Sequence, residues 1–274
     1  MCICPNLESL SVKIWSDIYD PRLEVPPENF LQGFNPFTTL RTYLISSASP
    51  FSIPNIISCI RSARAQSSHR RIPLTHFKIE VNGGIQKDLI FDLLDALDVC
   101  SLKTLVLDGI RYAQPDLIDK IAQTFPNLFD LVLIYRACDI QFQPGFIEWP
   151  CAAWEYASHF SSFKNLHYLG WNCRRAEPTI TIASMPCFEN DDFTIPMYDV
   201  DIPLDDERLL AKCLWSYCPS LEYMLITADI PALAFRRTIK DGLVQFENFT
   251  VMNLGAFGRN PSTGICWTPY FPRT

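Results

Sequence analysis

A short pattern of apolar positions recurs along the chain. It reads L-x-x-L-x-L, with other apolar residues allowed at each fixed position. Seven clear copies begin at Leu7, Leu40, Leu74, Leu102, Leu128, Leu166 and Leu221. The steps vary from 26 residues, between Leu102 and Leu128, to 55 residues, between Leu166 and Leu221. A weaker eighth copy begins at Phe249, with a competing register from Phe246. A phrase that recurs in this way predicts a stack of similar structural units.

Each copy predicts one short β-strand. Its last two apolar residues are two positions apart, so they face the same side of a strand. Its first apolar residue lies three positions earlier, where the chain bends into the strand. A single strand cannot bury such a row alone. Neighbouring copies therefore predict a parallel sheet with one continuous core.

The segments between the strands predict helices that return the chain. In residues 85–99, apolar residues recur at steps of four, which is typical of an amphipathic helix. Residues 53–65, 116–125 and 205–217 show the same periodicity. Alternation of strand and helix predicts right-handed parallel crossovers. We expect one α/β domain over residues 1–274, with a curved parallel sheet and helices on its outer face.

A doubly wound α/β domain also alternates strands and helices and is the alternative fold. Two features favour the stack. The phrase before each strand recurs almost word for word, which a doubly wound sheet does not require. The first strand is also not followed by a glycine-rich turn.

Two segments depart from the repeat. Residues 172–203 lie within the longest step and form a proline-rich, acidic insertion. Such insertions emerge on one face of a repeat array, so this one is either a recognition loop or decoration. Residues 141–154 hold a turn at Pro144-Gly145, followed by aromatic residues on a predicted helix, and we expect most of these aromatics in the core.

Composition narrows the functional classes. The 274 residues are 48% hydrophobic with a net charge of -7, which predicts a folded core and argues against a general nucleic-acid surface. No stretch is long and apolar enough to predict a membrane span, and no secretory signal is visible. Cys4 and Cys218 occupy the same slot before a strand, and Cys100 an equivalent one. The odd count of 11 cysteines and the absence of C-x-x-C favour free thiols in the cytoplasm or nucleus.

Charge is unevenly spread along the chain. A basic stretch comprises Arg61, Arg64, His69, Arg70 and Arg71. An acidic stretch comprises Glu189, Asp191, Asp192, Asp199, Asp201, Asp205, Asp206 and Glu207. Each is either a solvated face or one of two recognition patches of opposite sign.

The sequence carries no recognisable catalytic or cofactor motif. The four histidines form no H-x-x-x-H or H-E-x-x-H pair, and Asp199-Val200-Asp201 lacks the rest of an EF-hand loop. We expect the dipeptide Asp108-Gly109 to form a turn. We therefore assign no catalytic residue, no cofactor and no metal ligand.

The strand phrases resemble leucine-rich repeats, although most copies lack the usual following Asn or Cys. The longer units, openings such as Cys218-Pro219-Ser220-Leu221, and the segment 149–157 before Phe163 resemble the repeat region of F-box-like proteins of mushroom-forming fungi. This resemblance implies a substrate receptor of a cullin-type ubiquitin ligase. No F-box precedes the first repeat, so we expect a fragment or an F-box-less relative, which recruits the ligase adaptor only through an upstream F-box.

These observations predict a non-enzymatic protein-interaction module whose protein target is unidentified. The outward positions of the strands are the candidate contacts, and we select Asp130, His167, Tyr168 and Tyr223 because aromatic and polar groups suit protein interfaces. A degenerate relic without a partner is one alternative. The other is a hydrolase or transferase with its site at the strand C-terminal ends. Residues that follow the strands there are Asp108, Arg111, Arg136, Asp139, Cys173 and Arg174.

Overall fold

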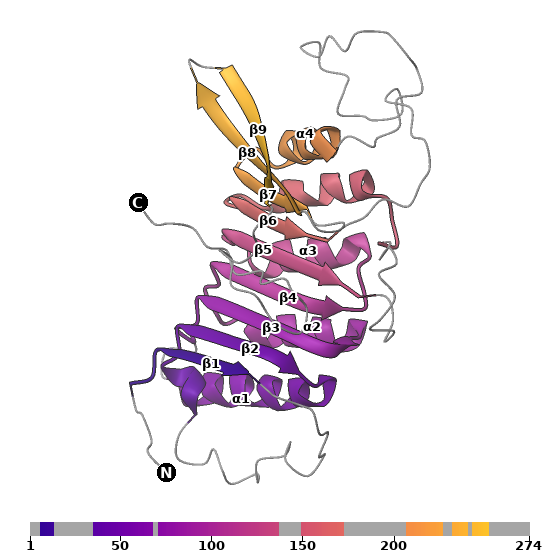
Figure 1. The fold of residues 1–274 in the computed structure, drawn as a ribbon. Coiled ribbons are helices and arrows are strands. Elements are labelled where there is room, and N and C mark those ends of the chain that lie inside the picture. Colours follow the sequence, from indigo (N-terminus) through magenta and orange to yellow (C-terminus); the bar gives the residue numbers. More distant parts are fainter. Residues whose placement is uncertain are drawn as a thin grey trace.

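The protein forms an α/β structure with a mostly parallel open sheet (Figure 1). The computed structural model describes residues 6–13, 35–67, 71–136, 149–172, 207–226, 232–240 and 243–251. The described strands follow their sequence order across the sheet. They are β1 (Ser9–Lys13), β2 (Thr42–Ala48), β3 (His76–Ile85), β4 (Thr104–Ile110), β5 (Asp130–Tyr135), β6 (Tyr168–Trp171), β7 (Tyr223–Ile226), β8 (Ala232–Lys240) and β9 (Leu243–Val251).

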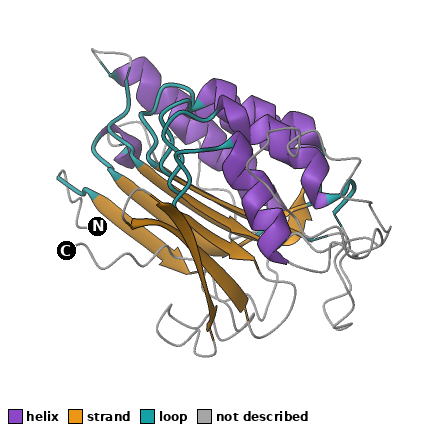
Figure 2. Cartoon of the chain, turned by 90° about the horizontal axis from the view of Figure 1, so that it is seen from above, coloured by secondary structure: helices purple, strands orange, loops and turns teal. Residues whose placement is uncertain are grey.

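The described helices cover one face of this sheet and leave the other open (Figure 2). All four predicted amphipathic helices are confirmed, with ends shifted by a few residues. Ile85 belongs to β3 rather than to the following helix. The helices are η2 (Pro36–Thr38), η3 (Pro50–Ser52), α1 (Ile53–Gln66), α2 (Lys87–Leu97), α3 (Pro115–Thr124), η4 (Ala153–Ser162) and α4 (Glu207–Tyr217).

The register of β1 to β7 aligns the repeated phrase copy for copy. The second apolar positions pair across the sheet as Leu10, Tyr43, Phe77, Leu105, Leu131, Leu169 and Met224. The third positions pair as Val12, Ile45, Ile79, Leu107, Leu133, Trp171 and Ile226. Both rows pack against the helices in one hydrophobic core. The predicted parallel strands and their inward rows are therefore confirmed.

The turn into each strand is also buried. From the second copy to the seventh, the first leucine of the phrase is at most 3% exposed. Cys100 and Cys218 are buried free cysteines, and Phe125 and Phe163 are buried in the corresponding slot. Burial raises the pKa of the Cys100 thiol to about 12. These cysteines therefore act as small apolar residues, as predicted, whereas Cys4 lies outside the described residues.

The weak eighth copy of the phrase does not add a parallel strand. Residues 243–251 form β9, which pairs antiparallel with β8, and β8 pairs antiparallel with β7. The expected repeat is wrong here because a hairpin, rather than a helix, connects the last two strands. The remainder of that copy, residues 252–254, lies outside the described part of the chain.

Aromatic residues fill the core beside β6, where the 3-10 helix η4 takes the place of an α-helix. The Trp149 and Trp171 ring centroids lie 5.1 Å apart, and Tyr156 packs edge-on against both rings. The Tyr156 hydroxyl donates a hydrogen bond to the Ala113 carbonyl. Phe160 completes the cluster at 1% exposure. The predicted core role of these aromatics is confirmed.

Gly109 allows β4 to bend where its pairing is irregular. It has φ +96°, and a Cβ atom there would lie 2.4 Å from the Val81 carbonyl oxygen. The register with β5 shifts between Asp108 and Ile110. The expectation of a turn at Asp108-Gly109 is wrong, because both residues belong to strand β4 and form an irregularity within it.

We expect Gly109→Ala to lower the free energy of unfolding by about 2–3 kcal/mol, because it adds a backbone clash to an unfavourable positive φ. Gly83→Ala is the matched control. Gly83 has φ +86°, yet its added Cβ would meet no atom closer than 3.5 Å. That variant should lose only about 1 kcal/mol. Urea denaturation of both variants tests the difference, and equal losses would contradict the close approach to Val81.

Candidate functional site

The open face of the sheet brings the four predicted contact residues together. Asp130 on β5 pairs with Tyr168 on β6, which pairs with Tyr223 on β7. His167 directly precedes Tyr168. The four residues thus lie on, or directly before, three adjacent strands, near the N-terminal ends of these strands. Their exposure differs, however, and it divides this face into two parts.

The first part is a buried apolar patch, which we call the floor. It consists of Val106, Val132, Ile134, Tyr168, Leu225 and Ala234, each at most 9% exposed. Tyr223 is half-buried and packs against the floor. The floor includes four outward strand positions that were expected to be open to a partner: Val106, Val132, Tyr168 and Leu225. Tyr168 in particular offers little surface to a partner.

Gly170 explains how the Tyr168 ring fits into the floor. A Cβ atom at Gly170 would lie 3.0 Å from a Val132 methyl group and 3.3 Å from the Tyr168 ring. The missing side chain therefore leaves the space that these two residues occupy. Burial, and then the charge of Asp130, raises the pKa of the Tyr168 hydroxyl above its ordinary value. The hydroxyl is consequently neutral at physiological pH.

The second part is an accessible row of residues at the N-terminal ends of the strands, which we call the rim. Backbone hydrogen bonds between strands connect these residues in order across the sheet. The rim comprises Glu8, Arg41, Thr75, Lys103, Phe129, His167, Glu222 and Arg237.

Side chains in the centre of the rim touch one another in sequence. Lys103 Nζ lies 4.5 Å from the centroid of the Phe129 ring. Phe129 stacks on His167 with centroids 5.0 Å apart and an interplanar angle of 7°. His167 Nδ1 lies 3.3 Å from a Glu222 carboxylate oxygen. Phe129 is nevertheless 36% exposed, so the stack presents an aromatic surface between a cation and an anion.

The remaining selected residues are held by neighbours. Asp130 accepts a hydrogen bond of 2.7 Å from the Thr104 hydroxyl, and this bond fixes its carboxylate beside the rim. The Arg236 guanidinium lies 5.3 Å from the Tyr223 ring centroid. Tyr223 and Asp130 are partly exposed, as is His167, so three of the four predicted contacts present surface.

Buried charges lie on the same face farther along β3 and β4, away from the rim. Glu80 pairs in register with Asp108, and the two residues are 2% and 4% exposed. Arg136 donates two hydrogen bonds to Asp108 Oδ1, of 3.1 Å from Nε and 2.6 Å from Nη2. Burial raises the pKa of the Asp108 carboxyl; Arg136 opposes this shift, and the Glu80 charge adds to it.

Two of the residues that were predicted to follow the strands belong to this group of charges. Asp108 and Arg136 meet there, whereas Asp139, Cys173 and Arg174 lie outside the described residues. Within the described part of the chain, no three His, Cys, Asp or Glu side chains are placed to hold a metal ion. The described helices also include none that is long and apolar enough to cross a membrane.

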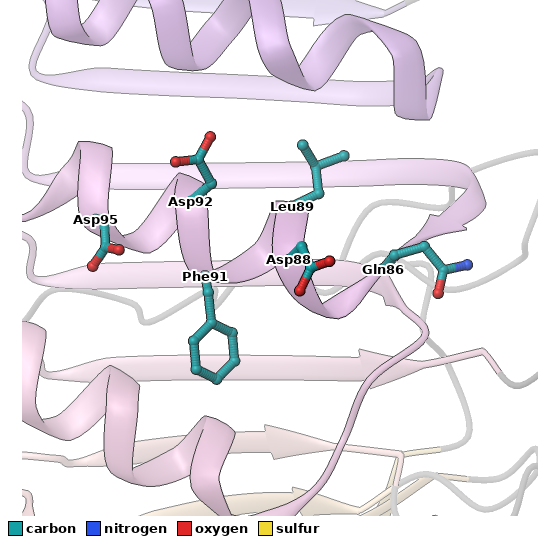
Figure 3. A pocket seen from close by; sticks show the side chains of 6 residues that line it. All are labelled: Gln86, Asp88, Leu89, Phe91, Asp92 and Asp95. Carbon is teal, nitrogen blue, oxygen red and sulfur yellow. The ribbon is translucent and has the colours of Figure 1, made fainter.

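The helical face carries most of the other charges. Arg61 of the basic stretch pairs with Asp92 on the next helix, α2, and Arg64 pairs with Asp98 directly after that helix. A shallow depression lies on the solvent side of α2 (Figure 3). Its lining residues are Gln86, Asp88, Leu89, Phe91, Asp92 and Asp95. Asp95 in turn pairs with Lys120 on α3. Because Arg61 and Arg64 are paired with carboxylates, the basic stretch is better interpreted as a solvated face than as a recognition patch.

The acidic insertion 172–203 lies outside the described residues after Asn172, as does all of the acidic stretch before Glu207. Asn172, directly after β6, forms hydrogen bonds with the last residue of β5, Tyr135. Its side chain accepts hydrogen bonds from the Tyr135 amide and the Trp149 indole and donates one to the Tyr135 carbonyl.

Sequence reasoning left out two parts of this face. Phe129 and Lys103 were outward positions but were not selected, although their slot matches that of His167 in the next copy. Glu80 and Lys78 were not considered, because the outward positions of the third phrase were left out. Alignment of all seven copies by register would have revealed both groups.

No protein-family model matches this sequence, and neither the curated proteins nor the solved structures contain a match.

The buried Asp108 gives a pH-dependent prediction. Its pKa is raised in the folded state, so between the unfolded and the native pKa the native protein binds more protons than the unfolded chain. Stability from this group is therefore highest at low pH and falls as pH rises through the native pKa. Relative to Asp108→Asn, the wild type should lose stability between pH 4 and pH 7. Urea denaturation of both proteins at the two pH values measures this, and parallel stability curves would contradict it.

Removal of the cation should cost more than removal of an exposed ion pair. We expect Arg136→Gln to lower the free energy of unfolding at pH 7 by about 3 kcal/mol, because Asp108 is left buried without its counter-charge. Lys120→Gln is the matched control. Lys120 and Arg136 side chains are both 28% exposed, but the Lys120 partner Asp95 is 57% exposed against 5% for Asp108. The control should lose less than about 1 kcal/mol. Denaturant titrations compare the two variants; equal losses would overturn this assignment.

Proposed function

We propose that the chain is an irregular leucine-rich-repeat-like solenoid that binds a protein target through the rim. The observation that carries this proposal is the continuous contact from Lys103 through Phe129 and His167 to Glu222. Aromatic residues are enriched at protein interfaces, and polar groups surround them, so an exposed aromatic stack flanked by Lys103 and Glu222 suits a contact surface.

The repeat interpretation draws support from the sheet. Seven copies of one phrase occupy equivalent strand positions, and the parallel strands follow their sequence order. A doubly wound sheet would instead reverse its strand order at a switch point and carry helices on both faces. A one-sided helical layer leaves the rim, at the start of the strands, available for recognition.

Within this proposal, the chain is the substrate-recognition region of an F-box-like protein. The repeated phrases and the segment 149–157 support this assignment through the resemblance they carry. The target would be a protein held at the rim in the cytoplasm or nucleus. Contact with a ligase adaptor would require an F-box outside these repeats. No catalytic role is assigned to the chain itself.

The enzymatic alternative has one favourable observation, the convergence of Glu80 and Asp108 at the strand ends. Both carboxylates are at most 4% exposed, and Asp108 is bound by Arg136. A substrate would have to displace this ion pair before it reached either carboxylate. The rim needs no such rearrangement, so the binding function fits better.

The test is a comparison of rim variants in affinity purification with quantitative mass spectrometry. Phe129→Ala and His167→Ala should each reduce recovery of the specific target at least tenfold, because a central hot-spot residue contributes about 2 kcal/mol or more to binding. Circular dichroism should show an unchanged fold, since neither side chain is buried.

Phe51→Ala is the matched control, because Phe51 is the other strongly exposed aromatic among the described residues, at 66%. It lies on η3, which follows the C-terminal end of β2, whereas the rim lies at the N-terminal ends of the strands. Its loss should leave target recovery unchanged. Equal recovery of all specific proteins by the rim variants and the wild type would reject the rim as the binding surface.

A further inference from the structure

A hollow of about 290 Å³ lies beside the rim, between the turns that lead into β4 and β5. Its lining residues are Cys100, Ser101, Leu102, Lys103, Thr124, Phe125, Pro126 and Asn127. Sites for complete small molecules usually measure about 300–1,000 Å³. The hollow therefore suits a single side chain of a larger partner. Lys103 belongs to both the hollow and the rim, so a protein bound at the rim passes its mouth.

The accessible polar groups of the hollow are hydrogen-bond donors. Lys103 supplies an ammonium group and Ser101 a hydroxyl, and both residues are exposed. Asn127 is also exposed, and its side-chain oxygen already accepts a hydrogen bond of 3.0 Å from Asn165 Nδ2. Its amide nitrogen is thus left to donate. No Asp or Glu occurs among the described lining residues. A carboxylate, which only accepts hydrogen bonds, matches this set of groups.

Lys103 also differs from the cations of the helical layer in its partners. Every Lys and Arg on α1, α2 and α3 is paired with a carboxylate: Arg61 with Asp92, Arg64 with Asp98, Lys87 with Asp116, and Lys120 with Asp95. In the described part of the chain, no carboxylate lies within ion-pair distance of Lys103. Its Nζ instead lies 4.5 Å from the centroid of the Phe129 ring. Lys103 is therefore available to a carboxylate from another molecule.

The acidic groups near the hollow are held by other residues. Asp98 is close enough to help raise the pKa of the Cys100 thiol, but Arg64 pairs with it at 3.6 Å. Glu222 lies beyond Phe129 and His167 along the rim and is paired with His167. An anion that enters the hollow would thus meet Lys103 before it met an uncompensated negative charge.

We propose that the hollow receives an Asp or Glu side chain of the protein target, while an apolar side chain of the target packs on Phe129. This inference rests on the proposed function and adds the chemistry of the partner. Because Lys103 Nζ lies 4.5 Å from the Phe129 ring, the two side chains of the target are close neighbours. The rim therefore fits a segment in which an acidic residue lies beside an apolar one.

The first test selects short random peptides, displayed on phage, with the full chain as bait. We expect the enriched peptides to carry Asp or Glu within a few positions of an apolar or aromatic residue. Selection on Lys103→Glu should enrich Lys or Arg at the acidic position instead. The same sequences from both baits, enrichment without acidic residues, or no enrichment on the wild type would each overturn the proposal.

The second test measures the affinity of the most enriched peptide by fluorescence anisotropy. Lys103→Glu and Ser101→Asp should each weaken binding at least tenfold, because each places a like charge beside the peptide carboxylate. A peptide with Lys in place of its acidic residue should bind Lys103→Glu more tightly than it binds the wild type. Circular dichroism checks the fold, which exposed positions should leave unchanged.

Lys164→Glu is the matched control. Lys164 is exposed in the corresponding turn before β6, but it does not line the hollow. The substitution changes the net charge by the same amount as Lys103→Glu. It should alter the peptide affinity less than twofold. Equal weakening by the two substitutions would assign the effect to net charge and reject the hollow as the site.

The rim variants separate this inference from the proposed function. If Phe129→Ala and His167→Ala weaken peptide binding whereas Lys103→Glu does not, the rim remains the binding surface and the carboxylate site is wrong. If Lys103→Glu weakens peptide binding but Phe129→Ala and His167→Ala leave target recovery unchanged, the carboxylate site remains and the proposed function of the rim is wrong.

Discussion

Every part of this structure depends on the alignment of one apolar row with the next. A single strand such as β5 presents Leu131 and Leu133 to one side, and only adjacent strands and the helical layer can remove them from water. A slip of one residue would turn both leucines toward the open face. The hydrophobic pattern therefore determines the register, and the register determines which residues meet on the opposite face.

That register gives the open face its division into floor and rim. The same alternation that buries Leu131 places Val132 on the floor, while the residue before the strand, Phe129, remains accessible. On the helical side, ion pairs such as Lys120 with Asp95 connect neighbouring helices at the surface. Such exposed pairs contribute little energy. The apolar rows thus provide the stability, and the polar edges are available for recognition.

The repeated phrase allowed prediction of the seven parallel strands and four amphipathic helices, because burial imposes a period that can be read from one sequence. The antiparallel hairpin was not predicted, because the apolar residues around Phe249 fit both the repeated phrase and an ordinary antiparallel strand. For the candidate site, the sequence located Asp130, His167 and Tyr223 on the accessible part. It did not reveal that Tyr168 is buried, because that burial depends on the space that Gly170 leaves on the next position of the same face.

The two ends of the parallel part of the sheet are unequal. In β1, Leu10 and Val12 are only partly buried, whereas their counterparts on β5, Leu131 and Leu133, are fully buried. At the other end of the parallel strands, β7 is paired on both sides, because the hairpin β8–β9 continues the sheet beyond it. Local opening begins where an element has the fewest buried contacts. Local opening of this protein should therefore have a direction, starting at β1 and advancing toward the centre.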